Sequence, residues 1–205
     1  MSLIRTVFLF VLLSLLTLST AISSDKVRLI IRGDDLGMSQ GSLEAVERSF
    51  NQGILTCTSI LVPGPWFEGA AELCKKNPGW CAGVHLCLIA EWRGMRWRPV
   101  LPWDRVPSIV DEDGFLYTYP DELFAKKPNL KEIDAEFRAQ IDLALKKGIN
   151  VQYIDTHYMS PRDLPYPGLK EVIDKISRDY NLPVSGYFEE QSGLSLGDVP
   201  IAQRL

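Results

Sequence analysis

Apolar residues recur along the chain with two different periods, and the alternation between them predicts the secondary structure. Short runs rich in β-branched residues indicate buried strands, whereas apolar residues spaced three and four positions apart indicate helices. The expected strands span residues 27–32, 54–62, 81–90 and 151–157, and a fifth begins within 182–187. The expected helices span residues 42–52, 67–76, 130–147 and 169–180. Residues 91–129 show little periodicity and are expected to form a long loop.

Strands that alternate with helices imply parallel βαβ units, so the expected fold class is α/β. Such units build either an open doubly wound sheet or a (β/α) barrel, and both place their chemistry beyond the carboxyl ends of the strands. Four or five strands cannot close an eight-stranded barrel. The alternatives are therefore an open sheet, a deformed barrel or an incomplete barrel.

Residues 1–21 have the pattern of a secretory signal peptide. One charge, at Arg5, precedes an apolar stretch from Val7 to Leu18, and small residues follow up to Ala21. An uncleaved membrane anchor is the alternative, but about a dozen apolar residues are fewer than the roughly 20 that span a bilayer. We therefore expect export, to the periplasm or the exterior, and a mature domain over residues 22–205 without a transmembrane helix.

The composition is that of a soluble globular protein. The 205 residues are 46% hydrophobic and 23% charged, and 22 basic against 26 acidic residues give a net charge of −4. This balance argues against a nucleic-acid partner. It does not select a substrate, because net charge bears on solubility more than on chemistry, and it leaves the oligomeric state open.

Export would place the four cysteines in an oxidising compartment, where disulfides form. Cys74 and Cys81 flank a Pro-Gly turn and are the expected pair. No C-x-x-C spacing is present, which argues against a zinc knuckle. Buried free thiols are an equally supported alternative, because cysteine packs well in apolar cores.

Polar residues gather at the ends of the expected strands. Asp34 and Asp35 directly follow the first strand, and the two histidines of the chain, His85 and His157, lie in the third strand and at the end of the fourth. The period of two places Asp155 on the same face as His157. A turn aspartate and hydrogen-bonded core histidines would be the structural explanation. Their equivalent places in successive βα units favour a common site instead.

One carboxylate and two imidazoles make a three-ligand site for a divalent metal, with positions left for water and substrate. A second carboxylate beside such a site can act as general base on the attacking water. Asp155 is suited to orient His157 or another ligand. No G-x-S-x-G motif is present, so a serine-hydrolase mechanism has no support.

Three segments resemble the motifs of the YdjC-like carbohydrate (chitooligosaccharide) deacetylases. They are Ile30-Ile31-Arg32-Gly33-Asp34-Asp35-Leu36-Gly37-Met38-Ser39, Gly83-Val84-His85-Leu86-Cys87-Leu88 and Asp155-Thr156-His157, in the family's order. The resemblance implies a deformed (β/α) barrel of the glycoside hydrolase and deacetylase type. It also implies hydrolysis of N-acetyl groups on amino sugars.

The resemblance further implies that Asp35, His85 and His157 bind the metal and that Asp34 is the general base. Water ligands would favour Mg²⁺ and imidazoles would favour Zn²⁺, so both metals remain open. Members of the family are generally longer, with a further functional residue, such as a histidine, in their C-terminal part. No histidine follows His157 here. Residues 22–205 are therefore expected to lack a C-terminal portion, as a fragment, a shortened product or a degenerate member.

The segment after the third strand carries candidate sugar-binding residues. Trp92, Trp97 and Trp103 offer flat apolar rings that suit the C–H face of a sugar, and Arg98 could bind its oxygens. A lid packed on the core would explain the same aromatics. Two other functions stay open: a non-catalytic carbohydrate-binding protein, and another metal-dependent hydrolase such as a phosphoesterase.

Overall fold

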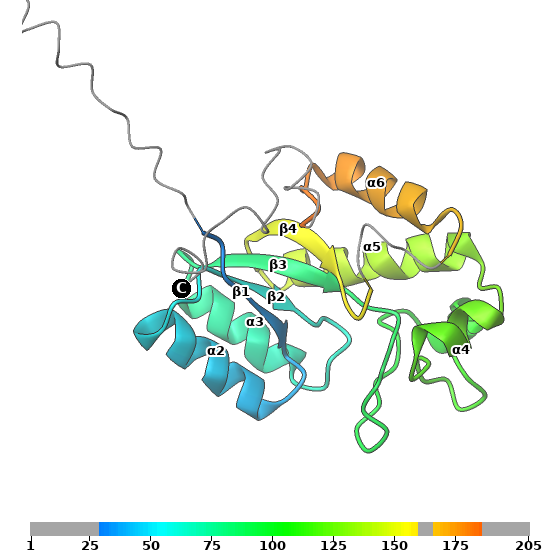
Figure 1. The fold of residues 1–205 in the computed structure, drawn as a ribbon, viewed down its shortest axis with the longest axis horizontal. Helices are drawn as coiled ribbons and strands as arrows, with labels where there is room; N and C mark the ends of the chain where they lie inside the picture. Colours follow the sequence, from blue (N-terminus) through cyan, green and yellow to red (C-terminus); the bar gives the residue numbers. More distant parts are fainter. Residues whose placement is uncertain (1–28, 160–165, 186–205) are drawn as a thin grey trace, which may run out of the picture.

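A four-stranded parallel sheet forms the centre of the fold. The computed structural model describes residues 29–159 and 166–185. Its strands are β1 (Arg32–Leu36), β2 (Cys57–Ile60), β3 (Cys81–Leu86) and β4 (Val151–Thr156). All neighbouring pairs are parallel and the spatial order is β1-β2-β3-β4 (Figure 1). Each strand therefore lies beside the next one in sequence, as in a barrel wall, whereas a doubly wound sheet reverses its order.

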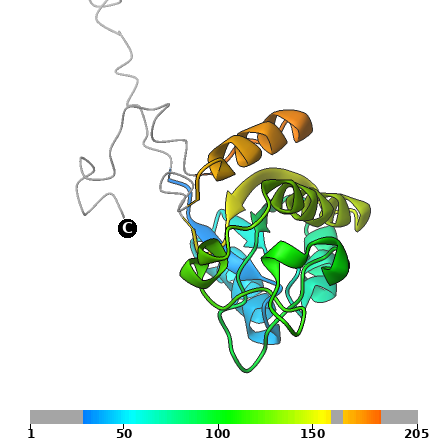
Figure 2. The same ribbon diagram turned by 90° about the vertical axis from the view of Figure 1, so that its right-hand side faces the viewer.

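Helices cover the outer face of this sheet. They are α2 (Gln40–Gln52), α3 (Phe67–Lys76), α5 (Leu130–Lys146) and α6 (Leu169–Tyr180), whereas the short α4 (Pro120–Ala125) lies beyond the end of the sheet. In Figure 2, α2 (blue), α3 (cyan), α5 (yellow-green) and α6 (orange) follow one another around the sheet. The core lies between the two layers, where Phe137 and Ile141 of α5 are fully buried. The expected α/β class with parallel βα units is confirmed.

The sheet is strongly curved. Arg32 Nη1 of β1 lies 2.7 Å from Asp155 Oδ2 of β4, although β2 and β3 separate these strands. In a flat sheet, strands three places apart lie about 14 Å from each other, which is too far for an Arg32–Asp155 ion pair. Tyr153 of β4 likewise crosses the sheet to reach Ser59 of β2, at 2.9 Å between hydroxyl oxygens. It passes over Gly83, where an added Cβ would lie 2.4 Å from the Tyr153 ring. The concave face is thus filled by side chains that join non-neighbouring strands.

Local sequence explains the helix starts and ends. Ser39 caps α2 through a reciprocal capping box with Ser42, and the Asn129 side chain accepts a hydrogen bond at the start of α5. Gly148 follows α5 in a left-handed conformation with φ of 80°. Helices α3 and α6 have the predicted bounds, and α2 and α5 differ from them by one or two residues.

The first strand was placed wrongly by the sequence pattern. It begins at Arg32, where the sequence predicted its end, and residues 27–28 lie outside the described residues. Leu29 and Ile30 are 39% and 67% exposed, so this apolar run does not enter the core. Pairing with β2 instead continues to Leu36, with a register shift between Gly33 and Leu36. The acidic pair therefore belongs to the strand rather than to a turn after it.

The four cysteines are free thiols, so the expected Cys74–Cys81 disulfide is not formed. Cys74 is buried on the inner side of α3, and burial raises the pKa of its thiol to about 11. Cys81 begins β3 and lies opposite Cys57 of β2 in the sheet register. The alternative of free, mostly buried thiols is the one that the structure supports.

The segment between β3 and α5 is more ordered than predicted. Strand β3 ends at Leu86, and Ile89 then makes a parallel bridge to Tyr117. Two short 3₁₀ turns, Trp103–Arg105 and Pro107–Ile109, precede α4. The buried carboxylate of Glu136 on α5 accepts hydrogen bonds from the backbone of Val100 and Leu101. Isolated bridges and short turns have no hydrophobic period, which is why the sequence indicated only a loop.

Val184 makes a parallel bridge with Ile154 of β4, where the fifth strand was expected to begin. Residues 186 and 187 of that expected strand lie outside the described residues, as do residues 1–21. Among the helices of the described part, none has the length and apolar character to cross a membrane.

Candidate metal centre

Three side chains converge at the carboxyl ends of β1, β3 and β4. Asp35 Oδ1 lies 3.0 Å from His157 Nδ1 and 3.5 Å from His85 Nε2. The three possible ligand atoms lie within 4.8 Å of one another. Both histidines are buried, at 3% exposure, and Asp35 is partly exposed. These three residues are the ones that the sequence analysis grouped as metal ligands.

The backbone aims Asp35 into this cluster. Asp35 has a φ of 60°, in the left-handed region that aspartate tolerates better than most residues. Gly37 follows with a φ of 104° and turns the chain into α2. The Oδ1 atom of Asp35 is buried and has no hydrogen-bond partner in the described part of the chain, because its contact with His157 lacks hydrogen-bond geometry. An orphaned carboxylate oxygen facing two ring nitrogens fits a cation between them.

A carboxylate fixes the ring of His85. Its Nδ1 lies 2.7 Å from Asp155 Oδ1, so this nitrogen carries the proton and Nε2 faces Asp35 with its lone pair. Asp155 is 2% exposed and accepts a further hydrogen bond from Ser59 at 2.8 Å. Asp155 also forms an ion pair with Arg32, whose Nη1 lies 2.7 Å from Asp155 Oδ2. The expected orienting role of Asp155 is therefore directed at His85 and not at His157.

His157 is held between two carboxylates. Its Nδ1 faces Asp35 and its Nε2 lies 2.9 Å from Glu91 Oε2. Burial opposes a charge on His157, but the neighbouring carboxylates of Asp35 and Glu91 outweigh it and raise the pKa of the ring to about 9. Burial likewise opposes the charge of Asp35, and the histidines keep the pKa of its carboxyl below the ordinary value. The carboxylates around His157 and the histidines around Asp35 thus favour opposite charges on these two neighbouring residues.

Asp34 lies beside the cluster and is the more accessible of the acidic pair. Arg32 Nε lies 2.6 Å from its Oδ1, and the Asp34 side chain is 42% exposed. One of its oxygens, a nitrogen of His85 and an oxygen of Asp155 also lie within 4.8 Å of one another. Asp34 is therefore close to the cluster, open to solvent and held in place by Arg32.

The aromatic candidates occupy different environments. Trp92 and Trp103 are 48% and 50% exposed, so their rings are open to a ligand. Trp97 is 3% exposed and donates its indole N–H to Cys87 Sγ. Its ring meets the edge of His157 at 6.2 Å between centroids, so it supports the site from inside. The guanidinium of Arg98 stacks over Phe115 at 4.4 Å.

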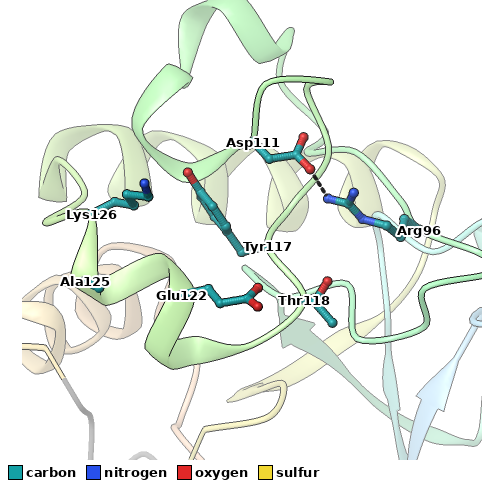
Figure 3. A pocket seen from close by; sticks show the side chains of 7 residues that line it. All are labelled: Arg96, Asp111, Tyr117, Thr118, Glu122, Ala125 and Lys126. Atoms are coloured by element: carbon teal, nitrogen blue, oxygen red, sulfur yellow. Dashed lines mark hydrogen bonds and ion pairs between the residues drawn. The ribbon is translucent and has the colours of Figure 1, made fainter.

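A cavity of about 430 Å³ lies on the segment between β3 and α5 (Figure 3). It is lined by Arg96, Asp111, Tyr117, Thr118, Glu122, Ala125 and Lys126. An ion pair between Arg96 and Asp111 closes one side of it. None of these lining residues belongs to the Asp–His cluster.

Four residues around the cluster were not predicted as site residues from the sequence: Arg32, Ser59, Tyr153 and Glu91. Tyr153 and Asp155 share a face of β4 by the period of two, which was a usable signal. Glu91 directly follows the expected third strand, where polar residues of parallel sheets gather. Ser59 carries no signal in the sequence, because its role depends on the curvature of the sheet.

Comparison with known proteins decides the family. A family model described as YdjC-like protein matches residues 28–199. The chain belongs to the YdjC-like family. The three motifs that resembled this family in the sequence lie within the matched residues, and their acidic and histidine residues form the cluster described above.

Relatives of this YdjC-like chain include named enzymes. A carbohydrate deacetylase of Enterococcus faecalis (strain ATCC 700802 / V583) is 34% identical over 132 residues, which are 64% of this chain and 48% of that protein. A carbohydrate deacetylase of Listeria monocytogenes serotype 4b (strain CLIP80459) is 31% identical over 151 residues, which are 73% of this chain and 58% of that protein. The chain thus spans about half the length of the curated relatives it matches.

A solved structure supports the fold. It is a crystal structure from Enterococcus faecalis V583 of a protein named for cellobiose-phosphate cleavage, with a TM-score of 0.66 and 31% identity. The match covers 76% of this YdjC-like chain and 57% of that chain. The curved parallel sheet with alternating helices is therefore shared with a solved protein.

Proposed function

We propose that this protein is a divalent-metal-dependent deacetylase that hydrolyses N-acetyl groups of amino sugars, with chitooligosaccharides as the leading substrate class. The observation that carries the proposal is the convergence of Asp35, His85 and His157 within 4.8 Å, with Asp34 beside them. The relatives named carbohydrate deacetylases support the same chemistry.

The residues of the cluster fit a divalent metal. They supply one carboxylate oxygen and two imidazole nitrogens, and they leave positions for water and substrate. The orphaned Asp35 Oδ1 is the atom that a cation would satisfy. A bound divalent ion would polarise the acetyl carbonyl and lower the pKa of the attacking water. Imidazole nitrogens favour Zn²⁺, whereas a water-rich site would accept Mg²⁺.

Asp34 is the proposed general base. Its exposed carboxylate is within reach of a water at the cluster and takes the proton of that water during attack on the acetyl carbon. Arg32 binds both oxygens of Asp34, at 2.6 and 3.2 Å, and so holds the carboxylate in a fixed orientation. The same guanidinium contacts Asp155, which places the base and the partner of His85 in one ion-pair network.

Trp92 and Trp103 are the proposed sugar-stacking residues, because both rings are about half exposed. Each follows β3 in the chain, on the segment that also supplies Glu91 and Trp97 to the cluster. A sugar ring stacked on Trp92, which follows Glu91, would lie near the carboxyl ends of the strands, where (β/α) proteins bind their substrates.

The test is acetate release from N-acetylated chitooligosaccharides by the Zn²⁺- or Mg²⁺-loaded protein. Metal-dependent release that stops on chelation is the expected result. Sugar binding without acetate release would favour a non-catalytic carbohydrate-binding protein. Metal-dependent release of phosphate from a phosphomonoester, with no acetate formed, would favour a phosphoesterase and end the deacetylase proposal.

Export is proposed from the pattern of residues 1–21, and a mature domain from residues 22–205. Expression of the full chain in a bacterial host, followed by mass spectrometry of the secreted or periplasmic protein, tests it. The expected N-terminal residue of the exported protein is Ile22. Retention of the intact N-terminus in the cytoplasmic fraction would contradict the proposal.

A further inference from the structure

We propose that Glu91 is a positioning residue of the metal centre, which fixes the ring of His157 with Nδ1 toward the ion. The inference rests on the proposed metal-dependent function. Glu91 lies outside both groups of residues whose ligand atoms lie close enough to share an ion, among the residues described. Its place is behind His157, on the side of the ring that faces away from Asp35.

The contact selects one tautomer of His157. Glu91 Oε2 lies 2.9 Å from Nε2, so the proton of a neutral ring stays on Nε2 and the lone pair is left on Nδ1. Nδ1 is the nitrogen that lies 3.0 Å from Asp35 Oδ1. The Glu91 side chain is 15% exposed and that of His157 is 4% exposed, so water competes little for this hydrogen bond.

The two histidines are held in the same way but by opposite nitrogens. Asp155 accepts a hydrogen bond from Nδ1–H of His85 and leaves Nε2 for the ion, whereas Glu91 accepts one from Nε2–H of His157 and leaves Nδ1. A carboxylate behind a ligating imidazole fixes the ring and makes it a stronger donor. Glu91 therefore does for His157 what Asp155 does for His85.

The charge of Glu91 is directed at the ring. Asp155 shares its charge with Arg32, at 2.7 Å. In the described part of the chain, Glu91 has an ion pair with His157 and none with a lysine or arginine. Within that part of the chain, the Glu91 side chain is thus directed at the His157 ring and not at a basic side chain.

The backbone holds Glu91 at a fixed point. The N–H of the preceding Ala90 donates to the Tyr117 carbonyl at 2.8 Å, and Ile89 bridges to the same residue. The buried Trp97 also packs against the His157 ring, in an edge arrangement. Glu91 and Trp97 therefore both reach the ring from a segment that is tied to the sheet.

Zinc titration calorimetry of the metal-free full chain tests this role, with Glu91→Ala, Glu91→Gln and the control Glu112→Gln. Glu112 is an exposed acid of the same segment, so its variant removes an equal charge away from the histidines. Glu91→Ala is expected to weaken zinc binding about 10- to 100-fold. Glu91→Gln keeps an acceptor for the hydrogen bond from Nε2–H, so its loss of zinc affinity is expected to be smaller. The control is expected to bind as the unaltered chain does.

A second readout separates positioning from folding. Cobalt-loaded protein reports ligand geometry in its visible absorption, and Glu91→Ala is expected to change this spectrum while Glu112→Gln does not. If Glu91→Ala fails to fold, the folded Glu91→Gln variant carries the test through its affinity and spectrum. Unchanged zinc affinity and an unchanged cobalt spectrum in the folded Glu91 variants would overturn the proposal.

The two proposals fail differently. An unaltered chain that binds no zinc would overturn both the metal centre and the role of Glu91. An unaltered chain that binds zinc, with weakened binding in Glu91→Ala but no acetate release from chitooligosaccharides, would overturn the deacetylase function and support the positioning role.

Discussion

Nδ1 of His85 lies 2.7 Å from Oδ1 of Asp155, and this hydrogen bond turns Nε2 of the same ring toward Asp35. The two residues are directly paired in the register of β3 and β4. Their alignment follows from the sheet itself, so the donor geometry of His85 is set by strand pairing. Asp155 therefore fixes the orientation of His85 toward the candidate metal ligand Asp35.

Asp155→Asn is expected to lower zinc affinity by about 10- to 100-fold, because the amide loses the charge that orients and strengthens His85. It also leaves Arg32 without its buried partner. Calorimetric zinc titration measures the effect. Ser59→Ala is the matched control: it removes one hydrogen bond to Asp155 but keeps the carboxylate and Arg32, so a smaller loss is expected. Equal affinities of Asp155→Asn and the unaltered chain would refute the orienting role.

Asp34→Asn is expected to reduce acetate release about 10²- to 10⁴-fold, the range for loss of a general base. Zinc affinity should change little, since Asp35, His85 and His157 remain. The rate with N-acetylated chitooligosaccharides and the zinc affinity are measured on the same preparation. Asp121→Asn, an exposed position on α4, serves as control with an unchanged rate. Undiminished turnover in Asp34→Asn would exclude this residue as the base.

Gln140→Ala is expected to lower the free energy of unfolding by about 2 to 4 kcal/mol. Gln140 is fully buried on α5; its amide donates to the Cys87 carbonyl and accepts from the Cys87 N–H. The alanine variant leaves both backbone groups unpaired in the core. Urea denaturation measures the loss. Gln152→Ala, at an exposed position on β4, should stay within about 0.5 kcal/mol of the unaltered chain, and a similar cost in both variants would contradict this account.

Asp111→Asn is expected to destabilise the fold by about 1 to 2 kcal/mol at neutral pH, and less in acid. Burial raises the pKa of Asp111. Hydrogen bonds from Arg96 and from the Phe115 and Asp113 backbone have the larger, opposite effect, so the pKa lies below its ordinary 3.8. A depressed folded pKa adds stability above the unfolded pKa, and this stability is lost as pH falls through the folded pKa. The difference between the two proteins should therefore be constant from pH 5 to 7, by urea denaturation, and shrink below about pH 4.

Asp104→Asn, an exposed position in the same segment, provides the control for charge removal. Its difference from the unaltered chain is expected to stay small across the same pH range. A stability difference for Asp111→Asn that persisted unchanged into acid would mean that the carboxylate charge of Asp111 is not what stabilises the turn.

The sequence predicted which acidic and histidine residues come together better than it predicted their surroundings. Asp35, His85 and His157 could be grouped because each lies in or directly after a parallel strand, and parallel strands end at one edge. The first strand was misplaced because the apolar run before Arg32 resembles a core strand, while the real strand carries the acidic pair. Two adjacent acidic residues do not fit the alternation of apolar and polar residues that predicts a strand. Their place in β1 is explained only by the side chains that pair with them in the folded structure.

The partners of the histidines could not be assigned from the sequence. Asp155 lies two residues before His157 but binds His85 on the neighbouring strand, and Glu91 binds His157 from a segment without periodicity. Such pairings depend on side-chain reach across a curved sheet, which strand prediction does not contain. The Cys74–Cys81 expectation failed for a related reason, because closeness in sequence does not bring two side chains together.

The contacts of Arg32 also bear on how the molecule folds. This residue of β1 binds Asp155 of β4 and, across 153 positions in the chain, the hydroxyl of Ser185. Contacts between such distant residues close long loops and form slowly, because the entropy of the chain opposes them until the intervening strands are in place. Zinc binding during refolding should consequently appear with the last kinetic phase, after the helical signal has been regained.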